Sequence, residues 1–304
     1  MKQTFYSNGK LLITGEYLVL DGAKAFALPT KFGQNLIVQK GSNQEIKWRS
    51  HDFDGSIWFE ETISFSEISN KINPEVETVK TTLITILYEA YRLNPDFINN
   101  AEGYIITTEL SFPKNWGLGT SSTLINNIAQ WLQINAFTLL KNSFGGSGYD
   151  IACAQNDSPI LYSIEAGNAK VEKVIFSPEF TENLYFVYLN KKQSSKVAIA
   201  SYYNNKNNHL EKKIITNNAI TQSVIGAETL NAFALAVEKH EIAMSNILEM
   251  KTVKEALFPD FKGVVKSLGA WGGDFVLAIS KENPTIYFNS KGYQTIIPYS
   301  EMIL

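Results

Sequence analysis

The spacing of hydrophobic residues predicts strands early in the chain and more helices later. Over the first sixty residues, short apolar runs are broken by glycines, and some alternate with polar residues, which favours strands. Leu83, Ile86, Leu87 and Tyr91 instead fall on one stripe of a helix. Strands are predicted at residues 10–14, 17–20, 35–39, 45–49, 104–110, 160–164, 184–189, 273–280, 285–288 and 294–298. Helices are predicted at residues 79–92, 121–132, 195–203, 210–223 and 227–248, and residues 147–150 open a helix or a turn.

The order of these elements favours an α+β fold over a regular series of βαβ units. Two layers that share a cleft fit a chain in which strands come first, mixed elements follow, and helices then return to strands. The 304 residues correspond to roughly two domains of about 150 residues each. The composition shifts mildly near residues 165–180, and the predicted domains are residues 1–170 and 171–304.

Composition and charge exclude several classes of function. Hydrophobic residues make up 44% of the chain and charged residues 19%, which is typical of a globular protein. The net charge of −3 argues against a dedicated surface for nucleic acid or anionic membranes. A single cysteine, Cys153, excludes an intrachain disulfide and a cysteine-based zinc site. The chain has neither an apolar leader nor an apolar run of about 18 residues, so we expect a cytoplasmic protein that binds neither membrane nor nucleic acid.

The strongest chemical signal is the sequence Pro-Lys-Asn-Trp-Gly-Leu-Gly-Thr-Ser-Ser-Thr at residues 113–123, between a predicted strand and a predicted helix. Gly117 and Gly119 allow the backbone to approach a ligand closely. Residues 120–122 fall at the helix N-terminus, where free amide hydrogens and the helix dipole attract phosphate. A hydroxyl there can also bind Mg²⁺. The alternative is a glycine loop capped by serine or threonine. Neither a Walker A motif nor a Rossmann fingerprint is present.

A second glycine-rich stretch surrounds one carboxylate. Residues 145–152 read Gly-Gly-Ser-Gly-Tyr-Asp-Ile-Ala, in which the glycines permit tight turns and anion nests. Asp150 is therefore a candidate to accept a hydroxyl proton or to orient a nucleophile. The alternative is that this aspartate caps a helix after a flexible turn.

Two further stretches complete the set. Residues 9–17 begin with Gly9 and Lys10, and a lysine beside an aspartate in a cleft would hold that aspartate ionised and neutralise phosphate charge. A lysine at the start of a strand is otherwise a solvated edge charge. Residues 268–274, Leu-Gly-Ala-Trp-Gly-Gly-Asp, form a glycine-rich turn before a strand, which by itself indicates only a chain reversal.

Together, these stretches resemble the motifs of the GHMP kinases, the superfamily of galactokinase, homoserine kinase, mevalonate kinase and phosphomevalonate kinase. Residues 9–17 resemble the first motif, residues 113–122 the ATP-phosphate loop Pro-x-x-x-Gly-Leu-Gly-Ser-Ser, and residues 269–273 the glycine-rich third motif. The resemblance implies a two-domain GHMP kinase fold. It would have an N-terminal domain like a ribosomal-protein domain, a ferredoxin-like C-terminal domain, and an active-site cleft between them.

The resemblance is greatest to phosphomevalonate kinase at residues 9–20 and 146–152, and Gly-Tyr-Asp-Ile-Ala at residues 148–152 marks a bacterial subgroup. It implies transfer of the γ-phosphate of ATP, with Mg²⁺, to a small-molecule acceptor by a monomer or homodimer. Asp150 matches the aspartate that engages the acceptor oxygen, and Lys10 matches the lysine that pairs with it. The predicted ATP-binding residues are Gly117, Leu118, Gly119, Thr120, Ser121 and Ser122, of which Ser121 also binds magnesium. The predicted acceptor-binding residues are Glu16, Tyr17, Ser147, Gly148, Ser194, Gly269 and Ala270.

Three positions depart from the pattern of the family. Tyr17 replaces the histidine usual in mevalonate kinases, and Trp271 interrupts the glycines of the third motif. Leu139 stands where mevalonate kinases often have a magnesium-binding glutamate. We therefore expect Mg²⁺ to rest on Ser121, phosphate oxygens and water.

The favoured acceptor is mevalonate or phosphomevalonate, on the resemblance alone. Homoserine, a sugar, or the ATP-consuming decarboxylation of diphosphomevalonate stay open, as does a non-catalytic nucleotide or metabolite sensor. An RNA-binding module, suggested by the likeness to a ribosomal protein, is disfavoured by the net charge.

Overall fold

The computed structural model of the chain describes residues 2–70, 76–192, 199, 202–203 and 210–304. The chain divides into two compact units, each made of several segments. Unit 1 comprises residues 1–9, 32–114 and 118–155, and unit 2 comprises residues 10–31, 115–117 and 156–304. The division passes through the glycine-rich stretch, between Gly117 and Leu118. The boundary expected near residue 170 stays a prediction.

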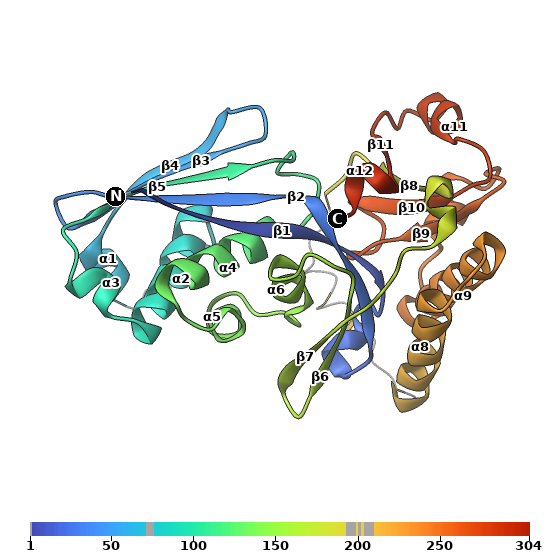
Figure 1. The fold of residues 1–304 in the computed structure, drawn as a ribbon, viewed down its shortest axis with the longest axis horizontal. Helices are drawn as coiled ribbons and strands as arrows, with labels where there is room; N and C mark the ends of the chain where they lie inside the picture. The colour runs from blue at the N-terminus through green and yellow to red at the C-terminus, as the bar shows by residue number, and fades with distance from the viewer. Residues whose placement is uncertain (1, 71–75, 193–198, 200–201, 204–209) are drawn as a thin grey trace. The chain divides into compact units, whose positions relative to one another are not determined.

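In unit 1, helices gather on one side of a group of paired strands (Figure 1). The strands β3 (Glu45–His51) and β4 (Ile57–Ser64) are antiparallel, and β3 runs parallel to β5 (Tyr104–Leu110). Residues 34–40 of β2 (Ala25–Lys40) pair antiparallel with β5, and β1 (Lys2–Thr14) also pairs with β2. The described helices of unit 1 are α1 (Phe65–Ser69), α2 (Val79–Leu93), α3 (Asp96–Asn99), α4 (Thr120–Leu132), α5 (Ala136–Ser143) and α6 (Tyr149–Ala154).

The core of unit 1 forms where alternate strand positions meet these helices. Ile46 and Trp48 lie two residues apart on β3 and therefore share a face of the sheet. Both are buried in one cluster with Ile106 of β5, Leu87 of α2 and Ile128 of α4. Burying an apolar side chain of this size stabilises a fold by roughly 1.5–3 kcal/mol. The helices therefore dock through their apolar stripes.

A buried hydrogen-bond network also fixes α4 in unit 1. The Asn126 side chain donates to Ser7 Oγ at 2.8 Å and accepts from Gln155 Nε2, just after α6, at 2.9 Å. Ser7 Oγ donates to Asn127 Oδ1 at 2.7 Å, and Asn127 Nδ2 donates to the Gln34 carbonyl at 2.9 Å. A buried polar group without a partner costs about 1–3 kcal/mol, so these bonds specify where α4 lies relative to β1, β2 and α6.

Unit 2 contains, among the residues described, a four-stranded antiparallel sheet in the order β11-β8-β10-β9. Its strands are β8 (Leu184–Tyr188), β9 (Val264–Ser267), β10 (Phe275–Ile279) and β11 (Ile296–Pro298). Separately, β6 (Ile160–Glu165) pairs with residues 25–27 of β2 and with β7 (Asn168–Lys173). The described helices of unit 2 are α8 (Leu210–Ile225), α9 (Leu230–Leu248), α10 (Val253–Leu257), α11 (Thr285–Ser290) and α12 (Tyr299–Met302), with 3₁₀ turns at Leu18–Asp21 and Glu179–Asn183.

The two faces of this four-stranded sheet pack against different parts of unit 2. Val276 and Ala278 of β10 belong to a buried cluster with Phe258 and Phe288. Leu277 lies between them in sequence and therefore faces the opposite side, where it lines a small cavity with Phe233 of α9. The helices α8 and α9 lie side by side, and α9 also contacts β9 (Figure 1). Side chains of α9 and β9 thus meet in the interior of unit 2.

Two predicted strands are wrong. Residues 17–20 form part of the 3₁₀ turn Leu18–Asp21, because Tyr17 and Gly22 have φ values of 59° and 89°, which end an extended strand. Residues 285–288 belong to helix α11, and the Asn283 side chain accepts the amide hydrogen of Thr285 at its start.

The helix predicted at residues 195–203 lies largely outside the described residues. Within the described ranges, no helix is long and apolar enough to cross a membrane. The other predicted helices and strands are confirmed, and most of their ends differ by a few residues. The strands predicted at residues 10–14 and 35–39 are much longer in the structure, where they form the last parts of β1 (Lys2–Thr14) and β2 (Ala25–Lys40).

The substitution Asn126→Ala removes both hydrogen bonds of this side chain and leaves Ser7 and Gln155 with fewer partners. We expect the free energy of unfolding to fall by about 2–3 kcal/mol, as measured by urea denaturation. Asn142→Ala, on the exposed surface of α5, is the matched control and should change it by less than about 0.5 kcal/mol. Equal effects of the two variants would contradict a structural role for the network.

Candidate active site

The glycine-rich stretch leads directly into the N-terminus of α4. Gly117 and Gly119 have φ values of 70° and 97°, in the left-handed region that favours glycine. Gly119 is the N-cap of α4 and has no side chain, so the alternative of a loop capped by serine or threonine is wrong. The first amide hydrogens of α4 therefore receive no help from an N-cap side chain and are suited to binding an anion.

Residues at the start of α4 differ in their exposure. Thr120 and Ser121 are half-buried, whereas Leu118 is fully buried. Thr123, one turn into the helix, donates its hydroxyl to Gln34 Oε1 at 2.7 Å. This bond holds the start of α4 against β2, while Thr120 and Ser121 keep part of their surface open to a ligand.

Asp150 is the second residue of α6 and is partly exposed. Gly148, with a φ value of 92°, is the N-cap of this helix, so the alternative in which Asp150 caps it is wrong. The helix α6 packs against α4 within unit 1, and the bond between Gln155 and Asn126 joins them. Cys153 is fully buried, as expected of a core residue.

Lys10, in unit 2, contacts the beginning of the glycine-rich stretch. Its Nζ donates to the Gly117 carbonyl at 3.1 Å, so it is more than a solvated edge charge. A Cβ added to Gly269 would lie 3.9 Å from this Nζ, so the third glycine-rich stretch passes beside the ammonium group. The Asp274 carboxylate packs so closely on Gly117 that a Cβ added to this glycine would lie 2.3 Å from Oδ2 of Asp274. Asp274 is buried, and its backbone has a φ value of 52°. Asp274 received no role in the sequence analysis. Its position directly after Gly272 and Gly273 was the one signal that could have identified it.

Glu16 belongs to a buried charge cluster that sequence reasoning missed. Its carboxylate forms an ion pair with Lys266 of β9, and Lys266 Nζ lies 3.4 Å from Oε2 of Glu241 on α9. Glu241 accepts the backbone and hydroxyl hydrogens of Ser267 at 3.0 and 2.9 Å. His240 Nε2 lies 3.5 Å from Glu16 Oε2. The four titratable residues are at most 2% exposed.

The cluster contains two carboxylates and one ammonium group, and its burial is the main influence on the protonation of Glu16. Burial raises the pKa of Glu16 to about 7, although Lys266 acts to lower it. Burial and the nearby Lys266 ammonium hold the pKa of His240 well below its usual value, so its ring is neutral at pH 7. A proton on Glu16 therefore neutralises a cluster that has little contact with water.

Tyr17 and Trp271, two departures from the GHMP pattern, contact each other. The Tyr17 hydroxyl accepts the amide hydrogen of Trp271 at 2.9 Å, and burial raises the pKa of this hydroxyl to about 12. The Tyr17 ring stacks on Tyr202, with centroids 5.7 Å apart. Trp271 is buried, and Lys266 Nζ lies 5.8 Å from its ring centroid. Tyr17 thus holds the third glycine-rich stretch against the end of the first.

The other residues predicted to bind the acceptor belong to both units. Ser147 and Gly148 lie directly before α6 in unit 1. Ala270 is buried in unit 2, next to Gly269. Ser194 lies outside the described residues.

The described residues contain no group of three or more histidine, cysteine, aspartate or glutamate side chains that could hold a metal ion. Leu139 is fully buried in the core of unit 1, so this position serves packing and supplies no magnesium ligand. The half-buried Ser121 at the start of α4 fits an Mg²⁺ ion that keeps several waters and is bound mainly through phosphate oxygens.

The fold is similar to that of several solved enzymes. The Methanococcus jannaschii mevalonate kinase has a TM-score of 0.69 at 15% identity, over 98% of this chain and 97% of that chain. The Streptococcus pneumoniae phosphomevalonate kinase, in complex with phosphomevalonate and AMPPNP, has a TM-score of 0.70 at 17% identity, over 96% and 97%. The Lactococcus lactis galactokinase complexed with galactose has a TM-score of 0.67 at 12% identity, over 95% and 88%.

A mevalonate diphosphate decarboxylase from Legionella pneumophila also shares the fold, with a TM-score of 0.59 at 11% identity. No family model matches the chain, and no curated protein matches it. At these identities the likeness concerns the fold, and the predicted α+β GHMP kinase fold is confirmed.

Glu16→Gln replaces the protonated carboxyl group by a neutral side chain of the same shape. Folded Glu16 has a pKa of about 7 against an ordinary value of 4.5, so between these values the folded state holds a proton that the unfolded state has lost. The stabilisation from this proton is fully present below pH 4.5 and is lost as the pH rises through 7. As the pH rises from below 4.5 to above 7, we expect the free energy of unfolding of the wild type to fall by about 3 kcal/mol relative to that of Glu16→Gln.

Urea denaturation of both proteins at a series of pH values measures this difference. Because the pKa of His240 is lowered in the folded state, both proteins lose stability as the pH falls below the ordinary pKa range of histidine. This loss is similar in the wild type and the variant, so it largely cancels when their unfolding free energies are compared. Glu282→Gln, at an exposed position, is the control and should show no such trend. A difference that stays constant with pH would refute the raised pKa of Glu16.

Proposed function

We propose that this chain is an ATP-dependent phosphotransferase that transfers the γ-phosphate of ATP to a hydroxyl or phosphate group of a small molecule. The observation that carries the proposal is the start of α4, where a loop with two glycines at positive φ ends on a glycine N-cap. Such a helix N-terminus is suited to binding phosphate. The fold shared with mevalonate kinase, phosphomevalonate kinase and galactokinase supports the same function.

In this proposal the amide hydrogens of residues 119–122 bind the phosphates of ATP. The helix dipole favours the negative charge, and the hydroxyls of Thr120 and Ser121 add further donors. The Lys10 ammonium, bonded to the Gly117 carbonyl, supplies positive charge at the first glycine of the loop. That charge would stabilise the phosphoryl group during transfer, when negative charge develops on its oxygens.

The proposal includes Mg²⁺, with Ser121 as the protein ligand. When bound, this ion neutralises phosphate charge and orients the β- and γ-phosphates. Phosphate oxygens and water would complete its coordination, which suits the reluctance of Mg²⁺ to lose its water shell.

Asp150 would orient the acceptor hydroxyl or accept its proton. Asp150 lies in the first turn of α6 and is partly exposed. Glu16 is only 1% exposed and is engaged by Lys266, so it would act on the acceptor by fixing the backbone of residues 15–17. Tyr17 would act in the same indirect way through Trp271.

Mevalonate or phosphomevalonate is the acceptor that we propose. Residues 9–20 and 146–152 resemble phosphomevalonate kinase most, and a mevalonate kinase and a phosphomevalonate kinase are among the similar solved structures. The buried Leu139 favours a second candidate, a sensor that binds nucleotide without catalysis, because it removes the acidic magnesium ligand of many mevalonate kinases.

Release of ADP, coupled to a spectrophotometric assay with Mg²⁺ and ATP, tests these candidates. The acceptors to compare are mevalonate, phosphomevalonate, diphosphomevalonate, homoserine and galactose. We expect turnover that depends on mevalonate or phosphomevalonate. Turnover with another acceptor would replace the proposed substrate, and nucleotide binding without transfer to any acceptor would favour the sensor.

Asp150→Asn keeps the size of the side chain but removes its negative charge. We expect kcat to fall by about 10³-fold, the contribution typical of a group that transfers or orients a proton. The affinity for AMPPNP, measured by calorimetry, should stay within about two-fold because the phosphates bind elsewhere.

The matched control is Asp96→Asn, which changes an exposed aspartate in the first turn of α3, another short helix of unit 1. This variant should keep wild-type kcat. Near-wild-type turnover of Asp150→Asn would remove Asp150 from the mechanism.

A further inference from the structure

Asp274 lies at the end of the third glycine-rich stretch and has an unusual backbone conformation. Its φ value of 52° falls in the left-handed region, which few residues other than glycine adopt and which aspartate adopts more readily than most. Its amide donates to the Lys191 carbonyl at 2.7 Å, and its own carbonyl accepts the amide hydrogen of Leu189 at 2.8 Å. Both partners follow β8, so two hydrogen bonds hold Asp274 in this conformation just before β10.

The side chain of Asp274 covers one side of Gly117. A Cβ added to Gly117 would lie 2.3 Å from Cγ and Oδ2 of Asp274 and 2.7 Å from Oδ1, so the whole carboxyl group packs on this glycine. Gly117 also has a φ value of 70°. Position 117 therefore requires glycine for two reasons, its backbone conformation and its contact with Asp274, which is itself only 9% exposed.

Two other contacts hold the chain just before this glycine. The Tyr188 hydroxyl, at the end of β8, donates to the Asn115 carbonyl at 3.0 Å. The Trp116 ring meets the ring of Phe275, the first residue of β10, edge to face at a centroid distance of 5.4 Å. Together with Asp274, these two strand residues hold three successive residues of the loop, and all of these contacts lie within unit 2.

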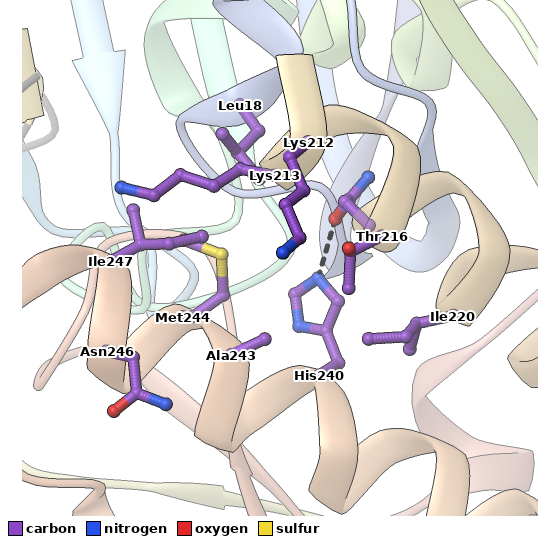
Figure 2. A pocket seen from close by; sticks show the side chains of 11 residues that line it. Leu18, Lys212, Lys213, Thr216, Ile220, His240, Ala243, Met244, Asn246 and Ile247 are labelled. Carbon is purple, nitrogen blue, oxygen red and sulfur yellow. Dashed lines mark hydrogen bonds between the residues drawn. The ribbon is translucent and has the colours of Figure 1, made fainter. Parts of the chain in front are cut away.

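Gly117 in turn holds the end of the Lys10 side chain. The backbone of Lys10 belongs to β1, and Gly15, directly after this strand, donates its amide hydrogen to His240, a buried residue on the side of α9 that faces α8 (Figure 2). The long stem of a lysine is flexible, so a fixed backbone alone does not fix its ammonium group. The Gly117 carbonyl accepts a hydrogen from Lys10 Nζ at 3.1 Å and so helps to determine where this positive charge lies.

The third glycine-rich stretch reaches both partners of this hydrogen bond. Asp274 packs on Gly117, while a Cβ added to Gly269, near the start of the same stretch, would lie 3.9 Å from Lys10 Nζ. One short segment of unit 2 thus contacts the residue that accepts this hydrogen bond and passes beside its donor. Gly117 has no side chain of its own that could hold it in place, so its contact with Asp274 serves this purpose.

We propose that Asp274 is a positioning residue for phosphoryl transfer. Its carboxyl group fixes Gly117, and the Gly117 carbonyl holds the Lys10 ammonium where negative charge develops on the transferred phosphoryl group. This role rests on the function proposed above for Lys10, and it assigns Asp274 no contact with ATP or the acceptor. The shape of the Asp274 side chain carries the role, because all three atoms of its carboxyl group pack on Gly117.

Two substitutions separate the shape of this side chain from its charge. Asp274→Gly removes the carboxyl group at a backbone conformation that glycine adopts without strain. Asp274→Asn keeps the shape, also tolerates the left-handed region and removes the charge. Asp260→Gly, at an exposed position of the same unit, is the matched control. Asp274→Ser, which shortens the side chain, takes the place of Asp274→Gly if that variant does not fold.

Nitrogen NMR of the lysine ammonium groups tests the link between Asp274 and Lys10 without ATP, acceptor or turnover. The Lys10 signal is identified by its loss in Lys10→Gln. We expect this signal to shift most in Asp274→Gly, less in Asp274→Asn, and not in Asp260→Gly. An unchanged signal in Asp274→Gly, or equal shifts in the two Asp274 variants, would overturn the proposal.

Steady-state kinetics, with an acceptor that supports ADP release, tests the consequence for catalysis. We expect Asp274→Gly to lower kcat by about 10- to 100-fold, the cost of a misplaced charged group. The KM for ATP should stay within about three-fold, because the interaction lost is one that acts in the transition state. Asp274→Asn should keep at least about a third of the wild-type kcat, since it keeps the packing on Gly117. A fall in kcat as large in Asp274→Asn as in Asp274→Gly would contradict a role carried by shape.

A double-mutant cycle with Lys10→Gln shows whether Asp274 acts through this lysine. In a chain that already carries Lys10→Gln, Asp274→Gly should lower kcat by less than about three-fold, because the group that Asp274 positions is absent. Effects of the two substitutions that multiply would show that Asp274 acts independently of Lys10 and would overturn the proposal. If the wild type transfers phosphate to no acceptor, the proposed function fails, and the ammonium signal alone decides whether Asp274 positions Lys10.

Discussion

The proposed site depends above all on the amide hydrogens at the N-terminus of α4, which need hydrogen-bond acceptors that the helix itself does not supply. A helix that begins after a glycine N-cap has no cap side chain to accept its first amide hydrogens. In unit 1 the buried bonds of Asn126 and Asn127 fix this helix in place, and the same network reaches the end of α6. The donors are therefore oriented by folding before any ligand arrives. This preorganisation is the condition under which amide hydrogens stabilise charge most effectively.

Unit 2 fixes the first glycine-rich stretch by a different kind of interaction. A buried ion pair adds little net stability, because removing charges from water costs about as much as their attraction returns. The pair of Glu16 and Lys266 instead fixes the position of residue 16 relative to β9. Residues 15–17 are each held by one contact. The Gly15 amide donates to His240 Nε2, the Glu16 carboxylate pairs with Lys266, and the Tyr17 hydroxyl accepts the amide hydrogen of Trp271. Lys10 lies on the strand that leads into them and contacts Gly117.

Local patterns predicted the glycine-rich turn into α4 and the strand β5, because the glycines of the turn and the alternating apolar residues of the strand are visible within a few positions. They could not predict the partner of Glu16, since Lys266 lies 250 residues away and a lysine in a short strand is usually solvated. The turn after Tyr17 was mistaken for a strand because its apolar residues are buried in a 3₁₀ turn. Helix α11 was mistaken for a strand because Thr285 and the residues that follow it favour strands in isolation.

Amide chemical shifts measure phosphate binding at α4 most directly. AMPPNP with Mg²⁺ would be titrated into labelled protein and followed by proton–nitrogen correlation spectra, with adenosine as the comparison. The predicted result is that the amides of residues 119–122 shift with AMPPNP, more than those elsewhere in α4, and stay in place with adenosine. Shifts at these amides that are absent, or equally large with adenosine, would show that this helix N-terminus does not bind the triphosphate.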